Sequence, residues 1–151
     1  MSIEDVTGAF LRSIDIHTVL PQRDPFVMVG TLVHWEPGSS TTETRVRADN
    51  LFVENGVFSS CGLLENIAQT CAARIGFYNR YILGQDVQIG YIGAIRDYVV
   101  TGQAPVGSLL TTTVDVLEEV FGMTLAVARV CCDGVPIAGC RVKLAIKDRE
   151  G

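Results

Sequence analysis

The sequence predicts an α+β fold in which one long helix packs against an antiparallel sheet. Three observations lead to this fold class. Only residues 59–83 place apolar side chains at helical spacing over many turns. Strand-like segments lie on both sides of that stretch, two before it and about four after it. The chain has 151 residues, the size of one domain, so we expect residues 1–151 to form a single domain.

A short helix and a β-hairpin are expected before the long helix. The helix is predicted over residues 14–20, and two prolines mark the loop that follows it. Residues 26–35 are almost continuously apolar, which is typical of a buried strand. After a Pro37–Gly38 turn, residues 42–48 alternate between small or apolar side chains and charged ones. This alternation predicts a second strand with one face in water, paired with the first.

The long helix is expected over about residues 60–83. Ser59 or Ser60 can cap its start, and Gly84 stands just past its end. Alanines and a leucine widen the apolar stripe, so the helix is expected to be mostly enclosed by the sheet. The stripe itself steps by four, four, four and three residues through Leu63, Ile67, Cys71, Ile75 and Tyr78.

Strand patterns resume after the helix and continue to the end of the chain. They cover residues 86–100, 109–120, 122–132 and 135–147. Asp133–Gly134 between the last two is the two-residue signal for a type I′ hairpin turn. These segments complete the predicted antiparallel sheet.

Composition excludes several classes of function. Twelve basic and seventeen acidic side chains give a net charge of −5, whereas sequence-independent binding of nucleic acid needs a basic surface. The mean hydropathy of +0.30 is high, yet no run of eighteen apolar residues occurs that would cross a membrane. The first fifteen residues lack the pattern of a signal peptide. We therefore expect neither a nucleic-acid partner nor a membrane.

The cysteines indicate a reducing compartment. Their number, five, is odd, no two of them are separated by two residues, and the chain has only two histidines. This pattern fits neither a disulfide framework nor a zinc site. Free thiols in a cytoplasmic protein without a metal are the expected arrangement.

Three segments carry a resemblance to a known family. In chain order they read SIDIHTVLPQRDPFVMVGTLV, FSSCGLLENIAQTCAARIG and IGYIGAIRDYVVTGQAPVGSLL. They resemble the opening helix and first strand, the central helix, and the following strand and turn of 3-hydroxyacyl-(acyl carrier protein) dehydratases. These enzymes serve fatty acid or polyketide-type biosynthesis. The resemblance implies a hotdog fold, a sheet curled around one central helix, and no cofactor.

The same resemblance assigns candidate site residues. Glu65 matches the catalytic carboxylate of the family, and Gln69 matches the glutamine that follows it. Ser60 stands where the family has a helix-opening glycine, whose backbone N–H helps to hold the thioester carbonyl. Two departures affect the chemistry. The loop before the helix, NLFVENGVFSS, lacks the family's acid/base histidine, and Gln22 replaces a histidine of the opening motif.

The chemistry of the residues leaves two interpretations of Glu65. A carboxylate in the first turns of an enclosed helix can act as a general acid or base. It can equally be a solvated residue that is favoured by the helix dipole. Gln69, four residues later, shares its helix face and can either bond to it or face water. His17 in the predicted N-terminal helix and His34 in the first strand are expected to be packing or surface residues.

The start of the long helix is a second candidate binding site. Unpaired N–H groups at Ser60, Cys61 and Gly62 can stabilise a thioester oxygen, and this needs no particular side chain. The thiol of Cys61 is expected to be a small buried group. Phe58 either lines a tunnel for an acyl chain or belongs to the core. Asn55 lies where the family histidine is missing, but Asn55–Gly56 is also a turn signal, which is the favoured interpretation.

Three functions remain open from the sequence. The first is an enzyme of acyl-thioester chemistry, either a dehydratase-like lyase or a thioesterase-like hydrolase, with an acyl carrier protein or coenzyme A conjugate as partner. The second is a subunit that pairs with a histidine-bearing paralogue, and the third is a non-catalytic acyl-binding module. A homodimer or higher even oligomer with sheets joined edge to edge is expected. An acidic carrier would need a basic patch, for which the candidates are Arg74, Arg80, Arg96, Arg141 and Lys143.

Overall fold

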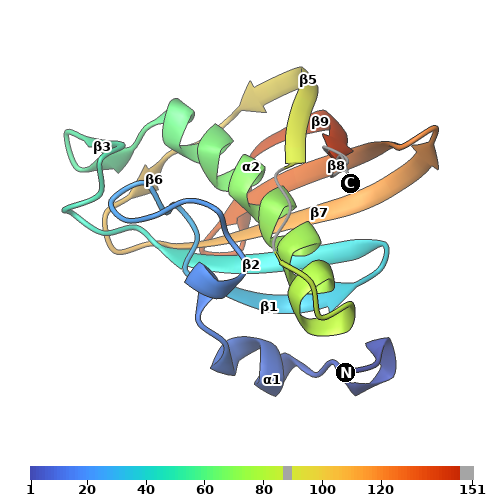
Figure 1. Ribbon diagram of the computed structural model, residues 1–151. Helices are drawn as coiled ribbons and strands as arrows, with labels where there is room; N and C mark the ends of the chain where they lie inside the picture. Colours follow the sequence, from blue (N-terminus) through green and yellow to red (C-terminus); the bar gives the residue numbers. More distant parts are fainter. Residues whose placement is uncertain (87–89, 147–151) are drawn as a thin grey trace.

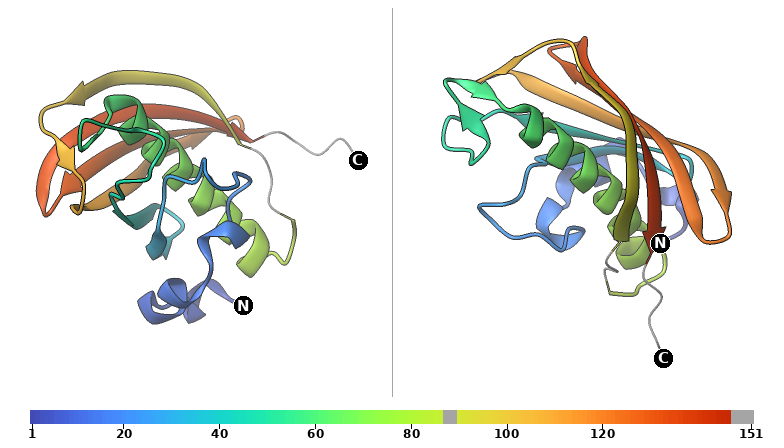
Figure 2. Two further views of the ribbon diagram at one scale, coloured as in Figure 1. Left: turned by 90° about the vertical axis from the view of Figure 1, so that its left-hand side faces the viewer. Right: turned by 90° about the horizontal axis from the view of Figure 1, so that it is seen from above.

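A six-stranded antiparallel sheet curls around one long helix, as Figures 1 and 2 show. The structure is a computed structural model that describes residues 1–86 and 90–146. Strand order across the sheet is β1-β2-β7-β8-β9-β5, so β1 and β5 form its two edges. This is a hotdog fold and confirms the predicted α+β class. The elements are β1 (Thr31–Glu36), β2 (Ser39–Arg45), α2 (Ser60–Phe77), β5 (Gly90–Val100), β7 (Leu109–Val120), β8 (Met123–Cys132) and β9 (Val135–Ile146).

Helix α2 lies in the concave face of the sheet and changes geometry at its end. The Oγ of Ser59 accepts a hydrogen bond from the N–H of Gly62 at 3.1 Å and caps the first turn. After Phe77 the chain continues as a π-helical turn, η3 (Tyr78–Ile82). Gly84 follows with a φ of 65°, the left-handed conformation that commonly ends a helix.

The apolar run of residues 26–35 is only partly a strand. β1 begins at Thr31, although Met28 and Val29 are buried as predicted. Side chains of α2 supply the hydrogen bonds that a neighbouring strand would supply. Gln69 Oε1 accepts from the N–H of Met28 at 2.7 Å, and Gln69 Nε2 donates to the carbonyl of Phe26 at 2.8 Å. Asn66 Nδ2 donates to the carbonyl of Met28 at 2.7 Å. The apolar pattern therefore correctly predicted that Met28 and Val29 are buried, but it wrongly predicted that residues 26–30 belong to a strand.

The N-terminal segment also differs from its prediction. Residues 14–20 contain a single 3₁₀ turn, η2 (Ile16–Thr18), where a short helix was expected. Asp15 starts this turn by accepting from the N–H of His17, and Pro21 ends the segment. The helix in this region is α1 (Gly8–Ser13), preceded by the 3₁₀ turn η1 (Ile3–Asp5). Buried side chains from this segment pack against Trp35 and Phe77 at the far end of α2; they are Leu11, Ile16, Val19 and Leu20.

The C-terminal half follows the predicted order closely. β7 covers the predicted range, and β8 and β9 are joined by the Asp133–Gly134 turn with φ values of 49° and 85°. Two positive φ values are the signature of a type I′ turn. Residues 87–89 and 147, at the ends of two predicted strands, lie outside the described residues. A small sheet was not predicted: β3 (Val53–Glu54), β4 (Val57–Phe58) and β6 (Ala104–Pro105), which lie near the start of α2 in Figure 1.

The core contains a polar layer between α2 and the sheet. Asn66 and Thr70 of α2 are fully buried and face Thr42 and Thr112 of the central strands. The hydroxyl of Thr112 donates to Asn66 Oδ1, and the hydroxyls of Thr42 and Thr70 lie 2.8 Å apart. Every one of these polar groups has a partner, which buried polar groups require. Within the described ranges, no helix combines the length and hydropathy needed to cross a membrane.

Candidate functional site

The start of α2 presents free backbone donors. Because the N–H of Gly62 is used by the Ser59 cap, the available donors of the first turn are the N–H groups of Ser60 and Cys61. Neither takes part in a hydrogen bond within residues 1–86 and 90–146, and both residues are exposed. Unpaired N–H groups at a helix N-terminus favour an anion or a polarised carbonyl oxygen.

Gly62 sits too close to two aromatic rings to carry a side chain. A Cβ atom at this position would lie 2.7 Å from Cβ of Phe52 and 2.8 Å from the ring of Phe58. Phe58 is buried and belongs to the apolar cluster beneath the helix. The contact holds the first turn of α2 against the small sheet and so determines where the free N–H groups point.

Glu65 is half-buried in the second turn of α2. Its Oε1 accepts a hydrogen bond from Gln69 Nε2 at 3.0 Å. Gln69 is fully buried, and its other bonds to Phe26 and Met28 leave it a single orientation. Cys61 and Glu65 are four residues apart on the helix and therefore share a face. Glu65 thus lies one turn after the residues with free N–H groups, and Gln69 holds its carboxylate.

Asn66 is a structural part of the site that sequence reasoning missed. It bonds to the carbonyl of Met28, to Thr112 and, at 3.2 Å, to Thr44 Oγ1. It stands three residues after Leu63 and four before Thr70, both buried, so helical spacing places it on an inward face. That spacing was the available signal for its role in joining α2 to β2 and β7.

Tyr98 brings the edge strand β5 to the start of the helix. Its hydroxyl donates to the carbonyl of Ser60, and burial raises the pKa of the phenol. Nothing in the sequence pattern singled out Tyr98, because β5 is interrupted by a register shift between Arg96 and Val99. Asp97 within that shift has a φ of 56°. The bulge redirects the side chains that follow it.

Asn55 lies in the turn between β3 and β4. It is exposed, and its φ of 53°, followed by a φ of 76° at Gly56, is that of a type I′ turn. The turn interpretation of Asn55–Gly56 therefore describes its local structure. Glu54 beside it is also exposed.

The two histidines lie outside the first turns of α2. His17 in η2 has Asp15 at 2.6 Å from Nδ1 and Asp24 at 3.0 Å from Nε2. The hydrogen bond to Asp15, then the one to Asp24, raises the pKa of His17. His34 is exposed on β1, with its Nε2 3.8 Å from Glu36. Of the two, only His17 makes hydrogen bonds to carboxylates.

The cysteines differ in accessibility. Cys61 is exposed, which corrects the expectation of a small buried thiol: it lies on the helix face of the half-buried Glu65 and not on the buried face of Leu63 and Ile67. Cys71 is buried in the core, and its desolvation raises the pKa of its thiol to about 12. Over the described part of the chain, no group of three or more His, Cys, Asp or Glu side chains is arranged to hold a metal ion.

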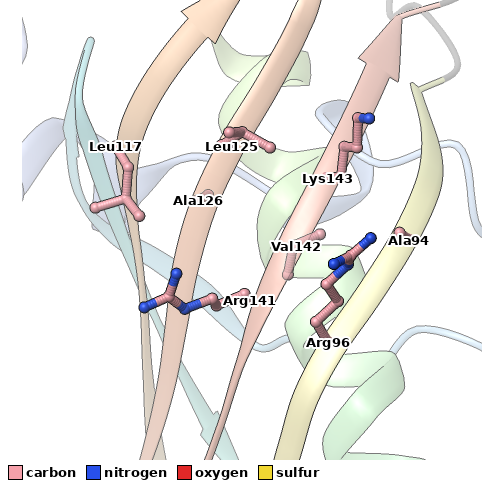
Figure 3. A pocket seen from close by; sticks show the side chains of 8 residues that line it. All are labelled: Ala94, Arg96, Leu117, Leu125, Ala126, Arg141, Val142 and Lys143. Carbon is pink, nitrogen blue, oxygen red and sulfur yellow. The ribbon is translucent and has the colours of Figure 1, made fainter.

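Three of the five basic candidates gather on the outer face of the sheet. Arg96, Arg141 and Lys143 line a hollow of about 290 Å³. Figure 3 shows their side chains on the strands, with α2 behind the sheet. The alternation of side chains along β9 places Arg141 and Lys143 on the outer face, because Val142 and Leu144 face the core.

The other two basic candidates lie elsewhere. Arg80 is exposed on η3, and Arg74 is largely buried and paired with Glu119. The basic side chains therefore do not surround the start of α2.

Comparison with known proteins gives a family match over most of the chain. The sequence model of the ApeP-like family, described as ApeP dehydratase, matches residues 14–149. A 3-hydroxyacyl-[acyl-carrier-protein] dehydratase FabZ from Ruminiclostridium cellulolyticum is 24% identical over 139 residues, covering 90% of this chain and 97% of the relative.

Solved structures show the same fold. The dehydratase heterocomplex ApeI:P from Xenorhabdus doucetiae matches with a TM-score of 0.82 and 16% identity, covering 91% of this chain and 94% of that one. A hypothetical thioesterase with coenzyme A from Streptococcus pneumoniae matches with a TM-score of 0.63 and 8% identity, covering 80% and 87%. Dehydratases and a thioesterase thus share this arrangement of a curled sheet and central helix.

Proposed function

Since this chain belongs to the ApeP-like dehydratase family, we propose that it acts on 3-hydroxyacyl thioesters and that Glu65 is its acid/base group. One observation carries the proposal. Glu65 is held by the buried Gln69 on the helix face that it shares with Cys61, at the end of α2 where two backbone donors are free. The acyl carrier protein in the name of the FabZ relative suggests the carrier, and coenzyme A is the other candidate.

The free N–H groups of Ser60 and Cys61 bind the thioester carbonyl oxygen in this mechanism. They stabilise the negative charge that develops on it when the proton on the neighbouring carbon is removed. Loss of one such donor typically costs a factor of about 10²–10³ in rate. The helix N-terminus contributes in the same direction, since its dipole favours negative charge.

Glu65 carries the proton in the same mechanism. Its carboxylate removes the proton from the carbon next to the thioester carbonyl, and the electron pair of that bond forms the new carbon–carbon double bond. The bond between the next carbon and the hydroxyl oxygen breaks. The protonated Glu65 returns the proton to the leaving hydroxyl, which departs as water. A typical general acid/base contributes a factor of about 10²–10⁴.

The test is a matched pair of variants on purified protein. With a 3-hydroxyacyl thioester as substrate, Glu65→Gln is expected to reduce conversion at least 100-fold. The control Glu54→Gln removes an exposed carboxylate of β3 and leaves the rate unchanged. Mass spectrometry identifies the product: an enoyl thioester supports dehydration, and a free acid assigns hydrolysis instead. Equal turnover in both variants would contradict the role of Glu65.

Pairing with a second, histidine-bearing subunit is the other candidate function. Two observations favour it: the loop before α2 has no histidine, and the ApeI:P neighbour is a heterocomplex. β5 is a sheet edge that exposes the apolar side chains Ile92, Ile95, Val99 and Val100, and an unpaired edge can pair with another chain. In such a complex, or in a homodimer, the partner would lie along β5, the strand that carries Tyr98.

Co-expression with a histidine-bearing paralogue separates this candidate from the first. Size-exclusion chromatography of the purified mixture is expected to give a mixed dimer. Its dehydratase activity should exceed that of either subunit alone and should fall with Glu65→Gln. If only homodimers form, or if the mixture is no more active than its parts, the second candidate is rejected. A charged substitution on β5, Val99→Lys, is expected to weaken the association, whereas Leu117→Lys, at an exposed position of β7 three strands from this edge, is not.

A further inference from the structure

The turn between β7 and β8 carries a fully exposed aromatic side chain. Phe121 is 100% exposed, and its turn stands at one end of the sheet in Figure 1. Its φ of 51°, followed by a φ of 75° at Gly122, is that of a type I′ turn. Asn or Gly is usual at the first position of such a turn, and bulky residues seldom adopt this φ. An aromatic residue in a strained and fully solvated position contributes nothing to the core of its own chain and is typical of a contact with a partner.

More exposed apolar side chains extend from this turn along the two strands. Leu117 and Val120 of β7 and Leu125 of β8 are exposed, and together with Phe121 they form an apolar patch, a common mark of an interaction site. Glu118 lies opposite Leu125 in the strand register. Its carboxylate makes no ion pair or hydrogen bond with any residue that the structure describes. The patch therefore combines an aromatic anchor with an unpaired negative charge.

The hollow on the outer face of the sheet has the opposite charge. Arg96 of β5 and Arg141 of β9 are directly opposite each other in the strand register, and Lys143 is two residues further along β9 on the same face. None of the three pairs with an acidic group among residues 1–86 and 90–146. Like charges directly opposite each other destabilise a sheet, so a carboxylate from outside the molecule is favoured here.

The same hollow has apolar walls that suit an aromatic ring. Leu117, Leu125 and Ala94 line it beside the three cations, and its described lining includes no acidic residue. Figure 3 shows these side chains on four neighbouring strands. A guanidinium group is also attracted to the face of an aromatic ring. An apolar and acidic turn therefore complements this apolar and basic hollow.

The turn and the hollow of one molecule are close enough to be exchanged between two copies. Leu125, which lines the hollow, is four residues after Phe121, or about 13 Å along a strand at 3.3 Å per residue. A two-fold axis between these points places each turn on the hollow of the other copy. Identical chains commonly associate by such reciprocal contacts, which close on themselves and do not continue into a filament.

From these observations we propose that two copies of this chain associate through the outer faces of their sheets. Phe121 of each copy packs on Leu125 and its neighbours in the hollow of the other, and Glu118 faces Arg141 and Lys143. The partner that fits this surface is thus a second copy of the chain itself.

The contact is weak and separate from the proposed reaction. One aromatic side chain buries about 150–250 Å², so two of them remain below the roughly 1,200 Å² of a stable interface. The association is therefore expected only at high protein concentration. It leaves the hydrogen-bonding edge of β5 and the start of α2 unoccupied, so it can add to a dimer along β5. Leu117→Lys is expected to weaken the outer-face contact and to leave an association along β5 intact.

Sedimentation velocity of the full-length protein over a wide range of concentrations tests the aromatic anchor. At the highest concentration, Phe121→Ser is expected to halve the mass of the wild-type assembly. The dissociation constant of the contact should rise at least about 10-fold, as is common for an anchor residue. The control Leu51→Ser removes another exposed apolar side chain, in the loop before β3, and leaves the mass unchanged. Equal mass and affinity in Phe121→Ser and the wild type would overturn the proposal.

A charge exchange tests the predicted pairing. Glu118→Lys and Arg141→Glu are each expected to weaken the association, because each brings like charges together, and the double variant is expected to restore it. Both positions are exposed, and melting temperatures check that every variant folds. A double variant no stronger than the single ones would contradict the pairing. Binding of an added acyl carrier protein that requires Arg141, without self-association of the wild type, would assign the hollow to another partner and reject the proposal.

Discussion

Gly76 of α2 lies directly against the backbone of Val19. A Cβ atom added to Gly76 would lie 1.9 Å from the carbonyl oxygen of Val19 and 2.9 Å from its carbonyl carbon. The helix and the N-terminal segment therefore meet backbone to backbone, without a side chain between them. This contact allows Val19 and Phe77 to be completely buried beside it.

Gly76→Ala is expected to destabilise the protein strongly. The methyl group would collide with main-chain atoms, which cannot turn aside as a flexible side chain can, so the cost is at least the ~1–3 kcal/mol of ordinary overpacking. The measurement is chemical denaturation. Gly38→Ala is the matched control, because nothing lies within 4 Å of a Cβ at that position. Equal stability of the two variants would show that the N-terminal segment moves freely away from α2.

Asn66→Ala is expected to cost more than removal of a surface amide. It leaves the carbonyl of Met28 and the hydroxyl of Thr112 buried without their partner, and each unsatisfied group costs about 1–3 kcal/mol. Gln103→Ala, at an exposed position of the loop before β6, is the control and is expected to be nearly neutral. The free energy of unfolding from urea titration checks both values. A loss below about 1 kcal/mol for Asn66→Ala would mean that water replaces the amide.

Stability is expected to depend on pH through His17. Since the folded state raises the pKa of His17, the protonated imidazole stabilises it. That contribution is complete below the ordinary value of 6.5 and is lost as the pH rises through the higher folded-state value. The effect is modest because the side chain is 40% exposed. The melting temperature is expected to fall less between pH 6 and 8 in His17→Gln than in the wild type.

His34→Gln serves as the comparison for that experiment. His34 is exposed and its Nε2 lies 3.8 Å from Glu36 Oε2, beyond hydrogen-bond distance, so this variant controls for the loss of an imidazole that is not hydrogen-bonded to a described carboxylate. An unchanged pH dependence in His17→Gln would mean that other groups account for it.

Thiol labelling is expected to discriminate between the cysteines. Cys61 is exposed and reacts first with iodoacetamide in the native protein, because the reagent can reach it. Cys71 and Cys140 are buried, and desolvation raises the pKa of both thiols, so they react only after unfolding. Peptide mass spectrometry at increasing labelling times measures the order. Labelling of Cys71 as fast as Cys61 would contradict the burial of the helix interior.

The long-range pattern of the sequence was sufficient for the fold class. The helical stripe from Leu63 to Ile75 and the strand alternation of β7 and β9 arise from burial on one face, which the spacing of apolar residues along the chain reveals. The two-residue strands of the small sheet were not predictable, because so short a segment shows no period. The π-turn after Phe77 was missed because the apolar spacing gives no sign of the change from α-helical to π-helical hydrogen bonds at Tyr78.

Only those contacts of the candidate site that join residues of the same helix could be predicted from the sequence. Ser59 as a cap and Glu65 beside Gln69 follow from spacing along one helix. Tyr98 and the Phe26–Met28 segment reach the same helix through space, from 38 and about 40 residues away along the chain. A carboxamide that replaces a strand partner has no signature in an apolar run, and for this reason residues 26–30 were predicted as a strand.

The hydrogen bonds of Gln69 and Asn66 to Phe26 and Met28 tie the irregular segment before β1 to helix α2. This segment is therefore expected to unfold together with the helix. The amide proton of Met28 has its acceptor on a side chain 41 residues later, so it is shielded from solvent only while α2 is docked. Its exchange with deuterium therefore requires residues 26–28 to separate from α2, which also breaks the bonds of Gln69 to Phe26 and of Asn66 to Met28. We expect the Met28 amide to exchange as slowly as those at the centre of β8, although no strand pairs with it.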